Sequence, residues 1–90
     1  MLPLPGEYLV RQGVADLASG LETVPALLVA IGAPRLRRLG FTLPEALPEV
    51  PEHRLYALLS ATEGDAAHSR YNALVRKLVS FERAAECGAR

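Results

Sequence analysis

The chain has 90 residues, half of them hydrophobic and 22% charged, and its ten basic and ten acidic residues give a formal net charge of zero. This balance is typical of a folded protein and excludes an intrinsically disordered chain. It also argues against a general binder of nucleic acid or anionic membrane, which needs a large basic excess. Ninety residues suffice for one hydrophobic core, so we expect a single domain over residues 1–90.

The prolines divide the chain into two halves. All seven lie between positions 3 and 51, and residues 52–90 contain none. Proline inside a helix removes a hydrogen bond and clashes with the preceding turn. The distribution predicts a broken half over residues 1–51 and an uninterrupted helix hairpin over residues 52–87.

The first predicted helix runs from about Pro5 to Ser19, with Gly20 at the left-handed position after its end. Gly13 lies inside this helix at a cost of up to about 1 kcal/mol relative to alanine. That glycine marks either a close helix crossing or a weak point. The apolar residues that recur at helical spacing and form the predicted buried face are Val10, Val14, Leu17 and Leu21.

A second helix is predicted from Val24 to Ile31, with Thr23 as its N-cap and Gly32 at its end. The segment is apolar on all sides, which is typical of a helix that is buried on all sides. We therefore expect it at the centre of the core. A short third helix, Pro34–Leu39, follows and is closed by Gly40.

Residues 41–52, FTLPEALPEVPE, form a predicted linker. Its three prolines favour extended backbone and disfavour a helix through them. We expect the glutamates to face water, and Leu43, Leu47 and Val50 to pack back onto the helices. The PxxP pattern from Pro48 to Pro51 is interpreted as a rigid connector, because its flanks are acidic and PxxP ligands usually carry basic flanks.

The second half predicts two helices joined by a short turn. The first runs from about Pro51 to Ala61, and the second from about Ala66 to Glu86, with Asp65 as its predicted N-cap. The longer helix carries an apolar stripe on one side, formed by Ala67, Tyr71, Leu74, Leu78, Phe81 and Ala85. A short connection between two helices indicates an antiparallel hairpin.

The expected fold is all-α: a small orthogonal or up-down bundle of four to five helices with a C-terminal antiparallel helix hairpin. No segment of the sequence alternates apolar and polar residues in the way a strand does. Glu82 falls at the edge of the apolar stripe. It is predicted to reach solvent or to pair with a basic group from another helix, for which Arg11 and Arg54 are the candidates.

Two groups of basic residues are candidate contacts for an anion or a partner. Arg35, Arg37 and Arg38 lie on the short third helix, where the alternatives are a nucleic-acid contact and a solvated rim paired with the linker glutamates. We favour the rim, because a recognition helix is normally longer. The second group lies on the last helix, where the polar side of an amphipathic helix is favoured over contact with RNA or an acidic partner. Its members are Arg70, Arg76 and Lys77, with Arg83 nearby.

The residues most suited to catalysis or metal binding do not form a recognisable motif. His68 and Cys87 are 19 positions apart on one predicted helix, which separates them by about 28 Å. Neither His53 nor His68 belongs to a zinc-binding pattern. We predict no catalytic, cofactor-binding or metal site.

Compartment and source follow from composition. A single cysteine cannot form an intramolecular disulfide, which suits a reducing compartment. The N-terminal segment lacks the features of a signal peptide, and the longest apolar run is shorter than the roughly 20 residues of a membrane span. We expect a cytoplasmic protein without a membrane role, and the bias toward arginine over lysine resembles bacterial coding sequence.

The sequence does not define a biochemical function. The leading hypothesis is a non-enzymatic protein-interaction or adaptor domain, which includes self-association as a homodimer. The alternative is a small nucleic-acid-associated regulator that uses an arginine patch. An enzyme ranks third, since it requires His53 or His68 to meet a carboxylate in a pocket.

Overall fold

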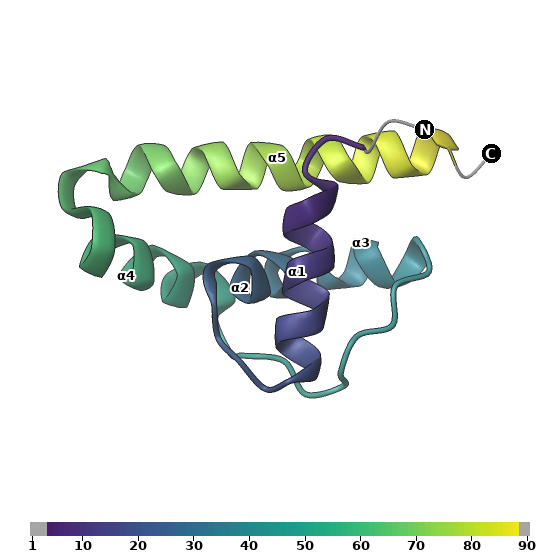
Figure 1. Cartoon of the computed structure of the whole chain (residues 1–90), viewed down its shortest axis with the longest axis horizontal. Coiled ribbons are helices and arrows are strands. Elements are labelled where there is room, and N and C mark those ends of the chain that lie inside the picture. Colours follow the sequence, from purple (N-terminus) through teal and green to yellow (C-terminus); the bar gives the residue numbers. More distant parts are fainter. Residues whose placement is uncertain (1–3, 89–90) are drawn as a thin grey trace.

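The computed structural model describes residues 4–88 and is helical throughout its regular elements. Figure 1 shows a long helix along one side of the molecule, a first helix that runs crosswise to it, and the remaining helices packed beneath. The all-α class, the small orthogonal bundle and the C-terminal helix hairpin are as predicted. The elements are α1 (Glu7–Ala18), α2 (Val24–Ile31), α3 (Ala33–Arg38), α4 (Pro51–Glu63), the 3-10 turn η1 (Gly64–Ala66) and α5 (Ala67–Gly88).

The start of α1 is fixed by its contact with α5. Gly6 adopts a left-handed conformation with φ of 72°, and a Cβ at this position would lie 2.8 Å from the carbonyl oxygen of Lys77. Only glycine fits both constraints without strain. The helix therefore begins at Glu7. The predicted start was Pro5, two residues earlier.

The crossing of α1 over α2 is close because of Gly13. A Cβ on this residue would lie 2.3 Å from the carbonyl oxygen of Pro25 and 2.4 Å from Cγ2 of Val29. Of the two interpretations of Gly13, the close helix crossing is therefore the correct one. The glycine costs helix propensity and in return lets the two backbones meet.

Helix α2 forms the centre of the core, as predicted. Leu27, Leu28 and Val29 are each at most 2% exposed. The hydroxyl oxygen of Thr23 accepts a hydrogen bond from the backbone N–H of Ala26 (3.2 Å), and the same hydroxyl donates to Asp16 (2.6 Å). The predicted N-cap therefore also ties the end of α1 to the start of α2.

Helices α4 and α5 form the hairpin, but their junction differs from the prediction. Helix α4 continues to Glu63, and Asp65 lies within η1. In the described residues Asp65 makes no capping hydrogen bond, because the chain passes through a tight 3-10 turn directly into α5. Tyr56 of α4 packs on Tyr71 of α5 with ring centroids 5.9 Å apart.

Two apolar side chains that were expected to be buried are exposed. Leu21 is 51% exposed, because Gly20 turns the chain with φ of 76° and takes Leu21 off the helical face of α1. Val50 is 55% exposed and has a left-handed φ of 46° at the start of α4, so the extended pattern of the linker ends there. Leu43 and Leu47 do pack against the core, as predicted.

The described helices include none with the length and apolarity that a membrane crossing requires.

Candidate interaction site

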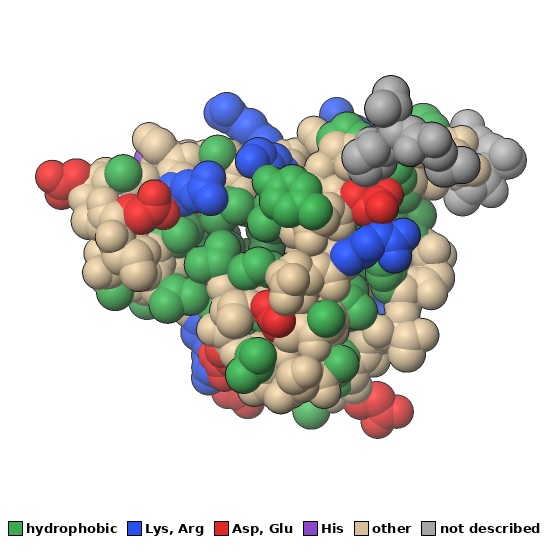
Figure 2. Space-filling view, viewed as in Figure 1, with side chains coloured by type: hydrophobic (Ala, Val, Ile, Leu, Met, Phe, Trp, Pro, Cys, Tyr) green, Lys and Arg blue, Asp and Glu red, His purple; other side chains and the backbone are tan. Residues whose placement is uncertain are grey.

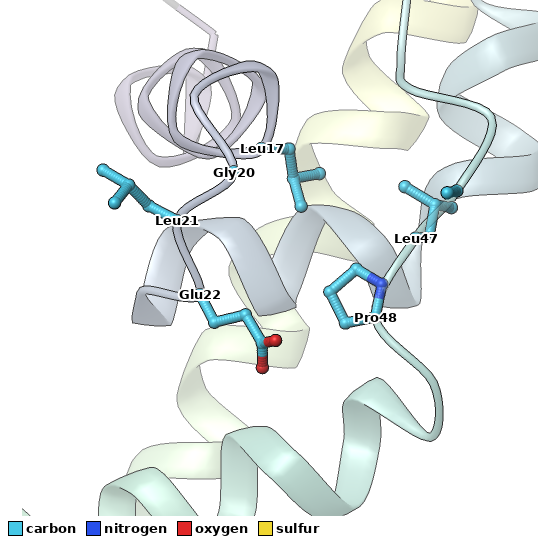
Figure 3. A pocket seen from close by; sticks show the side chains of 7 residues that line it. Leu17, Gly20, Leu21, Glu22, Leu47 and Pro48 are labelled. Carbon is cyan, nitrogen blue, oxygen red and sulfur yellow. The ribbon is translucent and has the colours of Figure 1, made fainter.

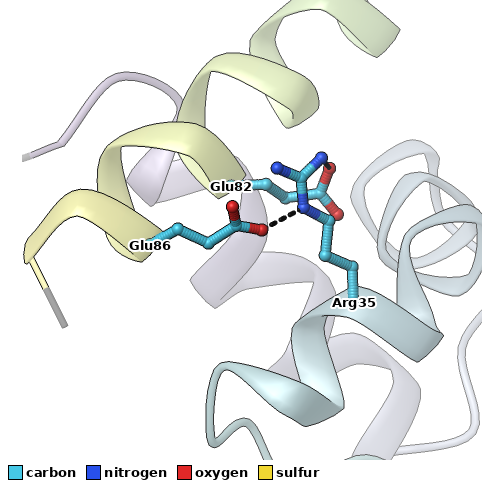
Figure 4. A network of polar contacts seen from close by, with 3 residues as sticks. All are labelled: Arg35, Glu82 and Glu86. Atoms are coloured by element: carbon cyan, nitrogen blue, oxygen red, sulfur yellow. Dashed lines mark hydrogen bonds and ion pairs between the residues drawn. The ribbon is translucent and has the colours of Figure 1, made fainter. Parts of the chain in front are cut away.

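The best-defined polar cluster joins α3 to α5. Arg35 extends from α3 toward two carboxylates on α5, as Figure 4 shows. Its Nε donates a hydrogen bond to Glu86, and its Nη1 donates to Glu82 at 3.4 Å. Glu82 does pair with a basic group from another helix, as one of the two alternatives predicted, but the candidate partners Arg11 and Arg54 were wrong. Those two arginines pair with Glu7 (3.0 Å) and Glu22 (2.8 Å) instead.

Glu82 is a buried carboxyl group, with only 4% of its surface exposed. Burial raises its pKa, and the attraction of Arg35 opposes that rise without cancelling it. The hydrogen bond to Glu86 in turn raises the pKa of Arg35. A Cβ on Gly32 would lie 2.9 Å from a Glu82 carboxylate oxygen, so this glycine lets the carboxyl sit beneath the α2–α3 junction. The cluster is best explained as a set of ion pairs that holds α3 against α5.

The three arginines of α3 contact different parts of the molecule. Arg35 is engaged with α5, and Arg37 donates a hydrogen bond from Nη2 to the carbonyl oxygen of Pro44 (2.6 Å). The sequence had assigned the cluster to the linker glutamates. The ion pairs of Arg35 are made with α5 glutamates instead, because α3 docks on that helix. Arg38 lines an open hollow of about 300 Å³ beside Val75 and Val79.

The basic residues of α5 do not join that group. Arg70 forms an ion pair with Glu63 (3.7 Å), and the ammonium of Lys77 donates to the Tyr8 hydroxyl (3.5 Å). At 100° per residue, Arg70 and Lys77 lie on the side of α5 opposite to Val75 and Val79. Arg76 is exposed and lies on the helix surface between these two sides. The six candidate residues therefore form no single patch.

The more coherent surface feature is apolar and lies around the loop between α1 and α2. One hollow, of about 270 Å³, is bounded by the end of α1, this loop and the linker. Figure 3 shows Leu17, Leu47 and Pro48 converging over α2, with Leu21 extending outward from the loop and Glu22 directed toward α4. A second hollow, of about 390 Å³, lies between Glu22 and α4.

The two hollows adjoin because both are bounded by Glu22. We call them together the loop groove. Its floor is largely apolar, from α1, α2, α4 and the linker. The lining residues are Leu17, Gly20, Leu21, Glu22, Leu27, Ala46, Leu47, Pro48, Arg54, Ala57 and Leu58.

The rim of the loop groove is mainly acidic. Glu22 accepts hydrogen bonds at both carboxylate oxygens from Nη1 of Arg54, each at 2.8 Å. Glu45 and Glu49 flank lining residues of the linker and are exposed, as predicted for the linker glutamates. In Figure 2, basic side chains gather over α5 at the upper edge, and acidic ones lie both at the lower edge and in the upper half of the molecule.

Sequence reasoning missed this groove. Its residues come from four separate segments, and apart from Pro48 of the PxxP pattern none belongs to a motif. One local signal was present: Gly20 ends the first helix, so Leu21 follows a turn and does not continue the helical face of α1.

The histidines and the cysteine lie away from these features. His53 and His68 line none of the three hollows described above, and the ring Nε2 of His68 lies 3.2 Å from the side-chain nitrogen of Asn72. His68 and Cys87 occupy opposite ends of α5, as the sequence predicted. Residues 4–88 contain no group of three or more His, Cys, Asp and Glu side chains arranged to hold a metal ion.

Comparison of the chain with known protein families, curated proteins and solved structures finds no match. The function of the chain is therefore inferred from the geometry of the loop groove and from the charges around it.

Proposed function

We propose that this protein is a non-enzymatic protein-interaction domain and that the loop groove is its binding surface. The observation that carries the proposal is the pair of adjoining apolar hollows with Leu21 half-exposed at their edge. Apolar anchors beside a polar rim are typical of protein interfaces.

The hydrogen bonds described above give less support to the nucleic-acid alternative. Arg35 and Arg37 donate hydrogen bonds to groups of the same chain, and Arg70 is paired with Glu63. As a contact surface, the full set of Arg35, Arg37, Arg38, Arg70, Arg76 and Lys77 stays a prediction. Binding to RNA that weakens steeply with added salt would restore this alternative.

Site-specific photo-crosslinking in the native cell tests the proposal. A photoreactive amino acid replaces Leu21, and in a matched control it replaces Tyr8, which is 66% exposed on α1 outside the loop groove. We expect a discrete protein adduct from position 21 and none from position 8. Adducts of equal yield from both positions, or no adduct from position 21, would count against the groove as a binding surface.

Self-association is one form of the same proposal, because exposed Leu21 and Val50 can be covered by a second copy. An adduct at position 21 with twice the mass of the chain indicates this form. Sedimentation velocity at micromolar concentration gives an independent reading of the oligomeric state.

A cytoplasmic location completes the proposal. The single cysteine, Cys87, is an exposed free thiol, which suits a reducing compartment. Fractionation of cells that express the native chain, followed by immunoblotting, tests the location.

A further inference from the structure

We propose that the loop groove accepts a basic amphipathic helix from another protein. This inference rests on the proposed interaction function and adds the chemistry of the partner. Its two parts are the shape of the groove, which selects a helix, and the charge of its rim, which selects basic residues.

The shape favours anchors spaced along one face of a helix. The hollow at Leu17, Leu47 and Pro48 and the hollow at Ala57 and Leu58 are separate but adjoin at Glu22. An amphipathic helix presents apolar side chains at intervals of three, four and seven residues, and such helices bind grooves through successive anchors. Two neighbouring hollows thus match two successive apolar anchors better than one compact ligand.

The charges around the groove do not balance. Glu22 is neutralised by Arg54, and Arg37 bonds to the linker through the carbonyl oxygen of Pro44. Within residues 4–88, Glu45 and Glu49 form no ion pair with this chain. The side chain of Asp16, next to the lining residue Leu17, is held by Thr23. The rim therefore carries a net negative charge that lysine or arginine on a partner helix would complement.

Apart from Arg54 in the groove and Arg37 at Pro44, the basic residues of the described chain line neither hollow and lie mainly on α5 and α3. The linker carboxylates are thus left facing solvent beside an apolar floor. An acidic rim beside apolar anchors favours basic partners and repels acidic ones, so it also supplies specificity.

Titration of the full chain with a matched pair of peptides tests the inference. Each peptide is a helix of about 18 residues, or five turns. Both carry the same leucine face and one tryptophan, and their flanking residues are lysine in one and glutamine in the other. The protein contains no tryptophan, so peptide fluorescence reports binding directly. At low salt we expect the lysine peptide to bind about three- to tenfold more tightly, and the difference to shrink as salt screens the charges.

Variants assign the charge preference to the rim. The double substitution Glu45→Gln and Glu49→Gln is expected to remove most of the lysine preference and to leave binding of the glutamine peptide unchanged. Asp65→Asn is the control, because Asp65 is exposed in η1, beyond the far end of α4 from the linker. It is expected to leave both affinities unchanged.

The possible results separate this inference from the proposed function. Equal, salt-independent binding of both peptides refutes the basic partner and keeps the groove as an interaction surface. Failure of both peptides to bind, together with no crosslink at position 21, overturns both proposals. Self-association that is lost on Leu21→Asp substitution identifies a second copy as the occupant and also overturns the inference.

Discussion

Substituting Gly13 by alanine gives the sharpest test of how α1 packs on α2. An alanine Cβ would lie 2.3 Å from the carbonyl oxygen of Pro25, which is 1.1 Å short of the 3.4 Å at which ordinary contact begins. The oxygen belongs to the backbone of α2 and cannot rotate away as a side chain can, so the two helices must move apart. The Val29 side chain, whose Cγ2 would lie 2.4 Å away, must shift as well.

The expected magnitude follows from two opposing effects. Alanine improves helix propensity by up to about 1 kcal/mol, whereas overpacking a close contact typically costs about 1–3 kcal/mol. Moving α1 away from α2 also loosens the packing around Val10 and Leu17, two buried residues of α1. We expect the free energy of unfolding to fall by about 2 kcal/mol, which in a domain of this size lowers Tm by roughly 8–16 °C.

Urea and thermal unfolding followed by far-UV circular dichroism measure the change. Gly88→Ala is the matched control, because the structure places nothing within 4 Å of its added Cβ. Its effect should stay within about 0.5 kcal/mol. If Gly13→Ala is as stable as the wild type, or more so, the close crossing is wrong. A single cooperative transition in the wild type also supports the proposal that residues 1–90 form one domain.

Three further substitutions test local features. Thr23→Ala removes the cap of α2 and should lower the free energy of unfolding, measured in urea, by about 1 kcal/mol. Thr23→Ser keeps the hydroxyl and should retain most of the wild-type stability, so equal losses in the two variants would contradict the capping role. Val50→Asn relieves the strain of a β-branched residue in the left-handed conformation and should raise the free energy of unfolding by about 1 kcal/mol. Val50→Ile keeps the β-branch and should give no such gain, so equal stability of the two variants would argue against that conformation. Burial raises the pKa of Glu82, so the folded chain holds this proton more tightly than the unfolded chain does. The resulting stability is fully present below pH 4.5 and is lost as pH rises through the raised pKa. Glu82→Gln should therefore gain stability relative to the wild type as pH rises above 4.5, and a difference independent of pH would refute this reasoning.

The sequence by itself determined the local elements. Proline positions, glycine stops and the period of the apolar residues predicted where the helices lie, because these signals act within a few residues of chain. The all-apolar segment Val24–Ile31 correctly marked the centre of the core. The cap at Thr23 was equally readable, since the cap and the amide that it satisfies are three residues apart.

Only the tertiary structure decided which helices meet. Arg35 pairs with Glu82 across 47 positions, and no local pattern distinguishes it from Arg11 or Arg54 as a partner. Gly13 was readable as either a crossing or a weak point until α2 was placed against it.

The loop groove depends most on tertiary structure, because its walls come from segments that are distant in the chain. The end of α1, the linker and α4 meet around Glu22 only after the helices have packed. The position of a helix is marked by residues within one or two turns of its ends and faces, whereas a surface is defined by the docking of whole elements. For that reason the sequence predicted a helical bundle, and the candidate site emerged only from the folded chain.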